Sequence, residues 1–287
     1  MNTPARAGGA PSWWPLLLAL FAGALLPLAF APFGWWPLAI ASPALLMWLW
    51  SDVSPRRAAL LGYSYGAGTF VEGTWWLYIS IHGFGGAPAW LSVLLILLLV
   101  ALMASYQALL GWCVARYLPA RGAWRWYAGL PALWLLTEWL RGWLISGFPW
   151  LSLGYSQSDT ILAGYAPVLG IYGLSALLLV QAGALLAFAA GRGAGRLVPL
   201  AVVLATWSGG AVLGRVEWTR ASGAPVPVAI VQGAIPQDEK WQLENRERTK
   251  ALYRELNGQT AGARLVVWPE AAVPELANEI APYLADI

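Results

Sequence analysis

One carboxylate, placed directly after an apolar run, is the strongest candidate for chemistry in this sequence. The segment "LVVWPEAAVPE" (265–275) passes through β-branched and aromatic residues, breaks at Pro269 and then presents Glu270. A carboxylate at the end of a rigid strand can serve as a general base, because the strand fixes its position. Two other interpretations, a solvated loop acid and a helix cap, stay open on the residues alone.

The segments around Glu270 predict a strand–helix–strand unit. "VPVAIVQGAI" (226–235) is a short apolar run typical of a buried strand. Residues 238–258 carry acids in the first turn and end in Asn-Gly, which indicates a helix. "ARLVVWPE" supplies the next strand, so the two strands are expected to be parallel. Ligands bind beyond the carboxyl ends of such strands, which is where Glu270 lies.

The composition divides the chain into two parts. Of all residues 59% are hydrophobic and 11% are charged, whereas a soluble domain has about 25% charged residues. Residues 1–214 hold nine Lys/Arg and four Asp/Glu, and residues 215–287 hold eight and ten. We therefore expect a membrane domain over 1–214 and a periplasmic α/β domain over 222–287. A unit this short cannot cover both faces of its sheet, so we expect an incomplete domain and a truncated chain.

Apolar segments predict seven transmembrane helices, since a span needs roughly 20 residues: about 13–31, 35–50, 58–79, 89–114, 122–140, 163–190 and 196–214. Eight arginines fall in alternate connections: Arg6, Arg56, Arg57, Arg116, Arg121, Arg125, Arg192 and Arg196. By the positive-inside rule these connections are cytoplasmic, so the N-terminus is cytoplasmic and residues after about 214 are periplasmic. The arginines stand singly or in pairs between apolar segments, which excludes a nucleic-acid patch.

Few ionisable residues interrupt the predicted spans. Glu138 and Arg141 are three apart, so they can pair on one helix face; the alternative is that they contact a lipid headgroup. Glu72 is an intramembrane acid, either functional or solvated near the interface. The aromatic loop "SGFPWLSLGYSQSD" (146–159) is a candidate substrate entrance. The single histidine, His82, is read as interfacial, and the sequence predicts no metal site because no His/Cys/Asp/Glu cluster exists.

Four stretches along the chain carry a family resemblance. They are "GTWWLYISIHGFG" (73–85), "TEWLRGWLISGFPWLSLGYSQ" (137–157), "VQGAIPQDEKW" (231–241) and "LVVWPEAAVPE". Together they resemble the apolipoprotein N-acyltransferases of bacterial inner membranes, which are membrane-bound members of the nitrilase superfamily. The resemblance implies a polytopic α-helical membrane bundle followed by the start of an α/β (nitrilase-like α-β-β-α) domain.

The resemblance also implies a reaction that needs no cofactor. An acyl chain passes from a phospholipid, typically phosphatidylethanolamine, to a cysteine as a thioester, and then to the amino group of a diacylglyceryl apolipoprotein. Glu270 matches the family's base, which takes the thiol proton because a thiol is mostly protonated near neutral pH. A lysine stabilises the oxyanion. Trp241 matches a tryptophan with a role in substrate binding.

The sequence departs from the family's pattern at two catalytic positions. Neither Lys240 nor Lys250 matches the family's lysine, and Cys113 lies in a predicted span and is read as an ordinary small apolar residue. We therefore expect the chain as it stands to be unable to complete the reaction. Two alternative functions stay open: a non-catalytic, transporter-like membrane protein and a membrane-tethered amidase.

Overall fold

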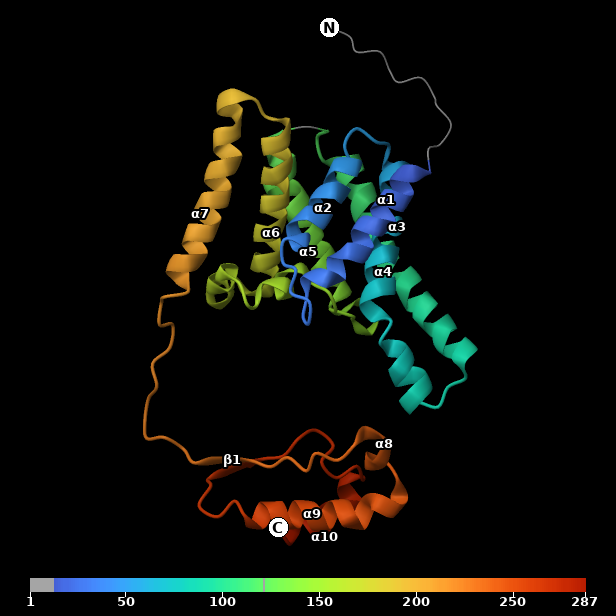
Figure 1. Ribbon diagram of the computed structural model, residues 1–287, viewed down its shortest axis with the longest axis vertical. Coiled ribbons are helices and arrows are strands. Elements are labelled where there is room, and N and C mark those ends of the chain that lie inside the picture. Colours follow the sequence, from blue (N-terminus) through green and yellow to red (C-terminus); the bar gives the residue numbers. More distant parts are fainter. Residues whose placement is uncertain (1–12, 121) are drawn as a thin grey trace. The chain divides into compact units, whose positions relative to one another are not determined.

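The computed structural model describes residues 13–120 and 122–287. The chain divides into two compact units, with the boundary in the sequence between Trp218 and Thr219. The first unit is helical (Figure 1). Its α-helices are α1 (Trp14–Leu25), α2 (Leu38–Leu49), α3 (Pro55–Thr74), α4 (Ala89–Tyr117), α5 (Leu130–Arg141), α6 (Ala166–Ala190) and α7 (Leu197–Leu213). Single-turn helices connect them: η1 (Leu26–Ala29), η2 (Ile79–Phe84), η3 (Arg125–Gly129), η4 (Leu144–Ser146), η5 (Leu153–Gln157), η6 (Ile161–Tyr165) and η7 (Gly193–Arg196).

The helices of the first unit follow the predicted apolar segments. Within the described residues, three helical stretches are long and apolar enough to cross a membrane: 89–117, 161–190 and 193–213. Two further apolar helical stretches, 14–29 and 38–49, are shorter. The expectation of a mostly helical chain with membrane-crossing helices is confirmed, and the total of seven crossings stays a prediction.

Helix α3 lies between α1 and α4, and its glycines explain the close approach. A Cβ added at Gly68 would overlap the carbonyl oxygen of Leu20 in α1, and one at Gly62 would overlap the carbonyl oxygen of Gln107 in α4. Small residues let helix backbones approach closely, which is how helices associate where the hydrophobic effect between them is weak. The close contacts of α3 with α1 and α4 therefore require glycine at these positions.

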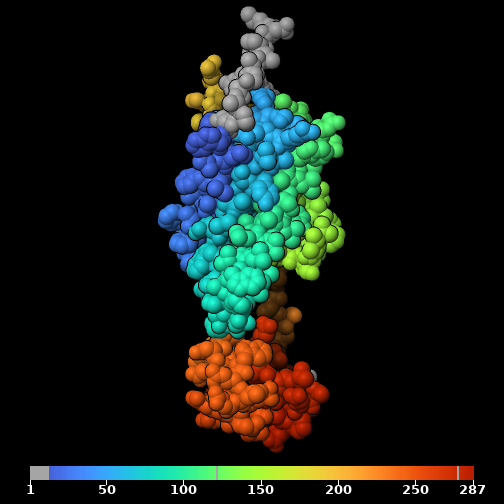
Figure 2. Space-filling model, turned by 90° about the vertical axis from the view of Figure 1, so that its right-hand side faces the viewer, coloured from blue at the N-terminus to red at the C-terminus, as the bar shows by residue number. Residues whose placement is uncertain are grey.

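The end of α3, η2 and the start of α4 form a helical hairpin that extends beyond the other helices of the first unit (Figures 1 and 2). The hairpin exposes large apolar side chains, including Trp75, Phe84 and Trp90. His82 lies within η2, where its Nδ1 is 2.7 Å from the carbonyl oxygen of Ala87. His82 thus helps to close the turn of this hairpin.

The second unit contains a two-stranded parallel sheet. Strands β1 (Val228–Ile230) and β2 (Leu265–Val267) pair in the register Val228 to Leu265. Between them lie α8 (Gln237–Lys240), η8 (Leu243–Asn245) and α9 (Arg246–Gly258), and α10 (Ala277–Ala285) follows β2. The predicted strand–helix–strand order and parallel pairing are confirmed. Assignment of this unit to a nitrilase-like domain stays a prediction.

The single helix predicted over 238–258 is wrong, because the chain leaves the helical path at Gln242. The backbone of Gln242 is extended, at φ −74° and ψ 129°. Asn245 supplies the compensation: its Nδ2 donates to the carbonyl oxygen of Glu239 at 3.1 Å and to Oε1 of Gln242 at 3.1 Å. These two hydrogen bonds from one side-chain amide stabilise the turn at which the helix is broken.

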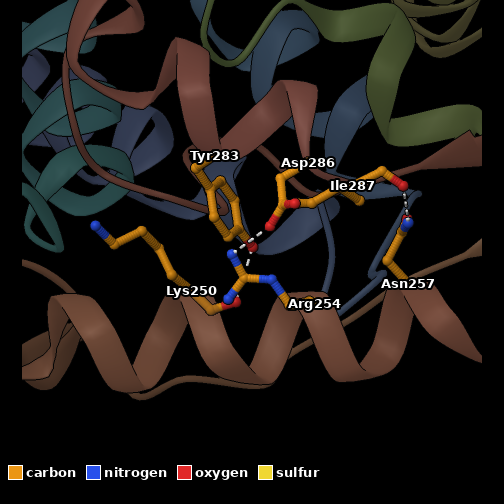
Figure 3. Close-up of polar contacts among 6 residues, drawn as sticks. All are labelled: Lys250, Arg254, Asn257, Tyr283, Asp286 and Ile287. Atoms are coloured by element: carbon orange, nitrogen blue, oxygen red, sulfur yellow. Dashed lines mark hydrogen bonds and ion pairs between the residues drawn. The ribbon is translucent and has the colours of Figure 1, made fainter.

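Helices α9 and α10 are joined by polar contacts and a cation–π contact (Figure 3). The hydroxyl of Tyr283 donates to the carbonyl oxygen of Lys250 at 2.8 Å. The guanidinium of Arg254 lies 5.0 Å from the centre of the Tyr283 ring and forms an ion pair with Asp286 at 3.1 Å. Burial raises the pKa of Tyr283, which keeps its hydroxyl a donor over the ordinary pH range.

Candidate active site

The carboxyl ends of β1 and β2 lie at the same edge of the sheet, because the strands are parallel. The pairing continues beyond the strands, since the amide of Val231 donates to the carbonyl oxygen of Val267 at 2.9 Å. Glu270 follows β2 by three residues and is exposed at this edge. The structure thus places Glu270 where the sequence predicted, and its role as a base stays a prediction.

The turn that carries Glu270 is held from two sides. Below it, the rings of Tyr253 and Trp268 are 5.0 Å apart in the core of the second unit. The ammonium of Lys240 donates to the main-chain oxygen of Glu270 at 3.0 Å. The carboxylate of Glu270 has no partner among the described residues, so it is available to accept a proton.

Backbone strain marks the same edge. Ala234, after β1, and Ala271, directly after Glu270, both have φ of 48°. This left-handed conformation is less favourable by about 1 kcal/mol for a residue with a Cβ. Such strain persists only where the surroundings fix the backbone, and it gathers at functional sites.

A small cavity of about 140 Å³ opens between the two strand ends. Its lining includes Gln232 after β1, Pro269 after β2, and Lys240 from α8. Trp241 follows Lys240 at the end of α8 and is 61% exposed. Lys240 therefore connects the segment that carries Trp241 with the turn that carries Glu270, a contact that residue spacing could not predict.

Glu138 and Arg141 lie in the other unit, near the end of α5, and both are buried. Oε1 of Glu138 accepts from the amide of Leu153 at 2.9 Å and from the Trp134 indole at 3.1 Å. Arg141 donates to the main-chain oxygen of Trp150 at 2.5 Å and to Ser152 at 3.2 Å. No direct ion pair joins the two side chains. The two side chains therefore do not form the direct pair considered in the sequence analysis. Both instead form hydrogen bonds to residues 150–153.

The loop that they hold is strained. Ile145, Ser146 and Leu151 have φ of 55°, 67° and 59°, values that favour glycine. The aromatic side chains of the loop stack, with the rings of Phe148 and Trp150 5.7 Å apart. Arg141 adds to this cluster because its guanidinium lies 5.1 Å from the ring centre of Phe70.

The loop forms one wall of a cavity of about 820 Å³ in the first unit. Residues 27–33 and 72–76 form the remaining walls, and the lining is mostly apolar. This volume is within the range of small-molecule and lipid sites. The predicted entrance loop is thus a cavity wall; its use by a substrate stays a prediction.

Two structural roles were not identified in the sequence analysis. Residues 27–33, at the end of the first predicted span, line the cavity, and the Trp35 amide closes their turn by donating to the carbonyl oxygen of Leu28 at 2.9 Å. Arg125 was read as a cytoplasmic marker, yet it is buried and donates to the carbonyl oxygens of Trp50 and Pro119, each at 3.1 Å. The proline and aromatic content of residues 27–33, beside an apolar span, was a signal for the first role. No sequence signal distinguished Arg125 from surface arginines.

Comparison with known proteins decides the family. Residues 22–185 match the sequence profile of the apolipoprotein N-acyltransferase N-terminal domain. The chain belongs to the apolipoprotein N-acyltransferase family.

Curated relatives extend the likeness beyond residue 185. Apolipoprotein N-acyltransferases from Methylococcus capsulatus and Vibrio cholerae are 42% and 40% identical over 93% and 94% of the chain. That from Azotobacter vinelandii is 44% identical over 96%. The chain spans about half the length of these relatives, 53%, 53% and 54% in that order. Each of these relatives is named as an acyltransferase.

Proposed function

We propose that this chain contributes the membrane domain and the first α/β elements of an apolipoprotein N-acyltransferase. The match to that family's N-terminal domain over residues 22–185 carries the proposal. An acyl chain from a phospholipid, with phosphatidylethanolamine as the expected donor, would pass through a cysteine thioester to the N-terminal diacylglyceryl cysteine of an apolipoprotein. The second unit would be the nitrilase-like part, over residues 222–287, facing the periplasm of a bacterial inner membrane.

Glu270 is the proposed general base. The parallel strands present it at the carboxyl edge, and its carboxylate is exposed, so it can take a proton from a thiol brought to that edge. Proton removal makes the thiolate that attacks the lipid ester, and the same glutamic acid returns the proton to the departing lipid alcohol. Trp241, exposed beside Lys240, would contact the substrate.

No lysine or cysteine of residues 1–287 stands where the family resemblance puts the oxyanion-stabilising lysine and the nucleophile. The proposal therefore concerns the full gene product. It also rests on orientation: eight arginines in alternate connections support a cytoplasmic N-terminus and a periplasmic second unit. Glu138 and Arg141 would act on substrate through the loop they hold, which lines the large cavity.

The test is Glu270→Gln in the full-length protein. The amide keeps the shape but cannot take a proton, so lipoprotein N-acylation should fall by about 100-fold or more. Mass spectrometry of lipoprotein N-termini measures the product, and membrane fractionation checks that the variant accumulates normally. Glu255→Gln, an exposed acid on α9, is the matched control and should leave N-acylation intact. Normal N-acylation by Glu270→Gln would remove Glu270 from the reaction.

A further inference from the structure

The large cavity of the first unit contains an acid that the proposed reaction does not use. Glu72 lines the cavity near the end of α3, and no hydrogen bond or ion pair occupies its carboxylate within residues 13–120 and 122–287. The described lining holds no Lys or Arg. An ionisable group in an apolar helix is costly, and such groups mark ligand or ion paths. Glu72 gives the cavity a negative site without a protein cation to balance it.

Aromatic side chains line the same cavity as this acid. Trp75 and Trp76 follow Glu72 at the end of α3, and Trp150 and Tyr155 come from the loop wall. The rings of Trp76 and Trp150 are 5.6 Å apart, so the two walls meet through these side chains. Aromatic faces attract ammonium groups, and a carboxylate beside them strengthens that attraction. The combination selects a positive charge over a negative one.

The rest of the cavity suits a hydrocarbon chain. Its remaining lining is built from proline, leucine, phenylalanine and alanine side chains of residues 27–33 and 149–151. A volume of about 820 Å³ exceeds what an ammonium group needs. The cavity thus combines a mostly apolar lining with one carboxylate and several aromatic side chains, which is the complement of an amphiphile whose headgroup ends in an amine.

We propose that Glu72 is a specificity-determining residue that binds the primary ammonium of an amphiphilic substrate in this cavity. The proposal rests on the proposed acyltransferase function and adds headgroup recognition to it. Two substrates of that function share the chemistry: an ethanolamine phospholipid, as acyl donor, and the free α-amine of a diacylglyceryl peptide, as acceptor. Both substrates place an ammonium close to apolar chains. The KM values for donor and acceptor distinguish which of the two Glu72 binds.

The first experiment compares wild type with Glu72→Gln in the full-length protein in nanodiscs. If Glu72 binds the donor, KM for the ethanolamine phospholipid should rise about 10-fold, and KM for a phosphatidylglycerol of the same chains should stay unchanged. If Glu72 binds the acceptor amine, KM for the diacylglyceryl peptide should rise with either donor. Glu217→Gln replaces an exposed acid outside the cavity and should change neither value. Unchanged constants for both substrates in Glu72→Gln would overturn the proposal.

A second readout does not depend on turnover. In the Glu270→Gln background, native mass spectrometry compares retention of ethanolamine phospholipid and phosphatidylglycerol, and of a diacylglyceryl peptide with a free α-amine and its N-acetylated form. Adding Glu72→Gln should abolish the preference for the ligand with a free amine. Should the protein lack acyl transfer while this preference exists and depends on Glu72, the proposed function fails and amine recognition holds. If Glu72→Gln misfolds, Trp150→Leu should lower the same preference. Equal retention of the ligands with and without a free amine, when Glu72 is present, would refute amine recognition.

Discussion

Arg141 donates a hydrogen bond to the main-chain oxygen of Trp150, nine residues further along the chain, at 2.5 Å. The arginine is buried at the end of α5, and Glu138, one helical turn earlier, binds the amide of Leu153. One helix end thus fixes a loop that would otherwise have to hold three left-handed residues by itself. The wall of the large cavity depends on this attachment.

Arg141→Lys should loosen the cavity wall. Lysine cannot reproduce the two directions in which the guanidinium donates, and a buried hydrogen bond to a charged group contributes about 1.5–3 kcal/mol. We expect a lower melting temperature of the full-length protein in detergent and a weaker affinity for lipid. Arg192→Lys, at an exposed arginine, serves as the control. An unchanged melting temperature for Arg141→Lys would contradict the attachment.

Glu138→Gln should be tolerated better than Glu138→Ala. Glutamine keeps the Oε1 acceptor for Trp134 and Leu153, whereas Oε2 of Glu138 has no hydrogen-bond partner in the described chain. Alanine leaves two buried donors unpaired, at about 1–3 kcal/mol each. Chemical denaturation of both variants measures the difference. Equal destabilisation would show that the charge of Glu138, not its acceptor oxygen, is what the loop needs.

Gly62→Ala should be far more disruptive than Gly73→Ala. Both new methyl groups meet an atom at close range, but at Gly62 that atom is the main-chain oxygen of Gln107, and at Gly73 it is the tip of the Leu151 side chain. A backbone cannot move without separating α3 from α4, so about 1–3 kcal/mol is expected at Gly62 and less at Gly73. Thermal unfolding measures both variants, and the reverse order would contradict the packing described for α3.

Lys250 should stabilise the second unit in a pH-dependent way. Its ammonium forms ion pairs with Glu247 at 2.5 Å and Glu275 at 3.4 Å. The hydrogen bond to Glu247, followed by the smaller effect of Glu275, raises the pKa of Lys250 above its ordinary value. A raised pKa means that the contribution is full below the unfolded-state pKa, about 10.4 for lysine, and is lost as the pH rises through the folded-state value.

The measurement compares melting temperatures of wild type and Lys250→Met from pH 8 to 12. The wild-type advantage should be constant up to about pH 9 and shrink above the ordinary lysine pKa. An advantage that grows with pH would contradict the assignment. Arg254→Met, which removes the ion pair with Asp286, should show no such loss in this range because arginine stays charged.

Local patterns predicted the second unit well. The β-branched runs at 226–235 and 265–268 and the acids and Asn-Gly around the intervening helix depend only on neighbouring residues, and the parallel pair followed. The break at Gln242 could not be predicted, because the Asn245 amide that offsets it acts through the folded turn. The residue types around Gln242 predict a continuous helix, whereas the side-chain contact of Asn245 accompanies the break in the fold.

The first unit shows the limit of the same reasoning. Spacing placed Glu138 and Arg141 on one helix face, since i and i+3 residues are neighbours, and left two interpretations open, a local pair or contact with a lipid headgroup. Their partners are instead in the loop that follows. Glu72 stood out by its charge, but its cavity is also built from residues 39–45 positions before it and 77–83 positions after it. Hydropathy finds helices without showing which of their faces enclose a space.

Because Arg141 grips main-chain oxygen at Trp150, the path of the loop does not depend on which side chain stands at that position. A substitution at position 150 should therefore change the shape of the chamber while the main chain that frames it stays attached to α5.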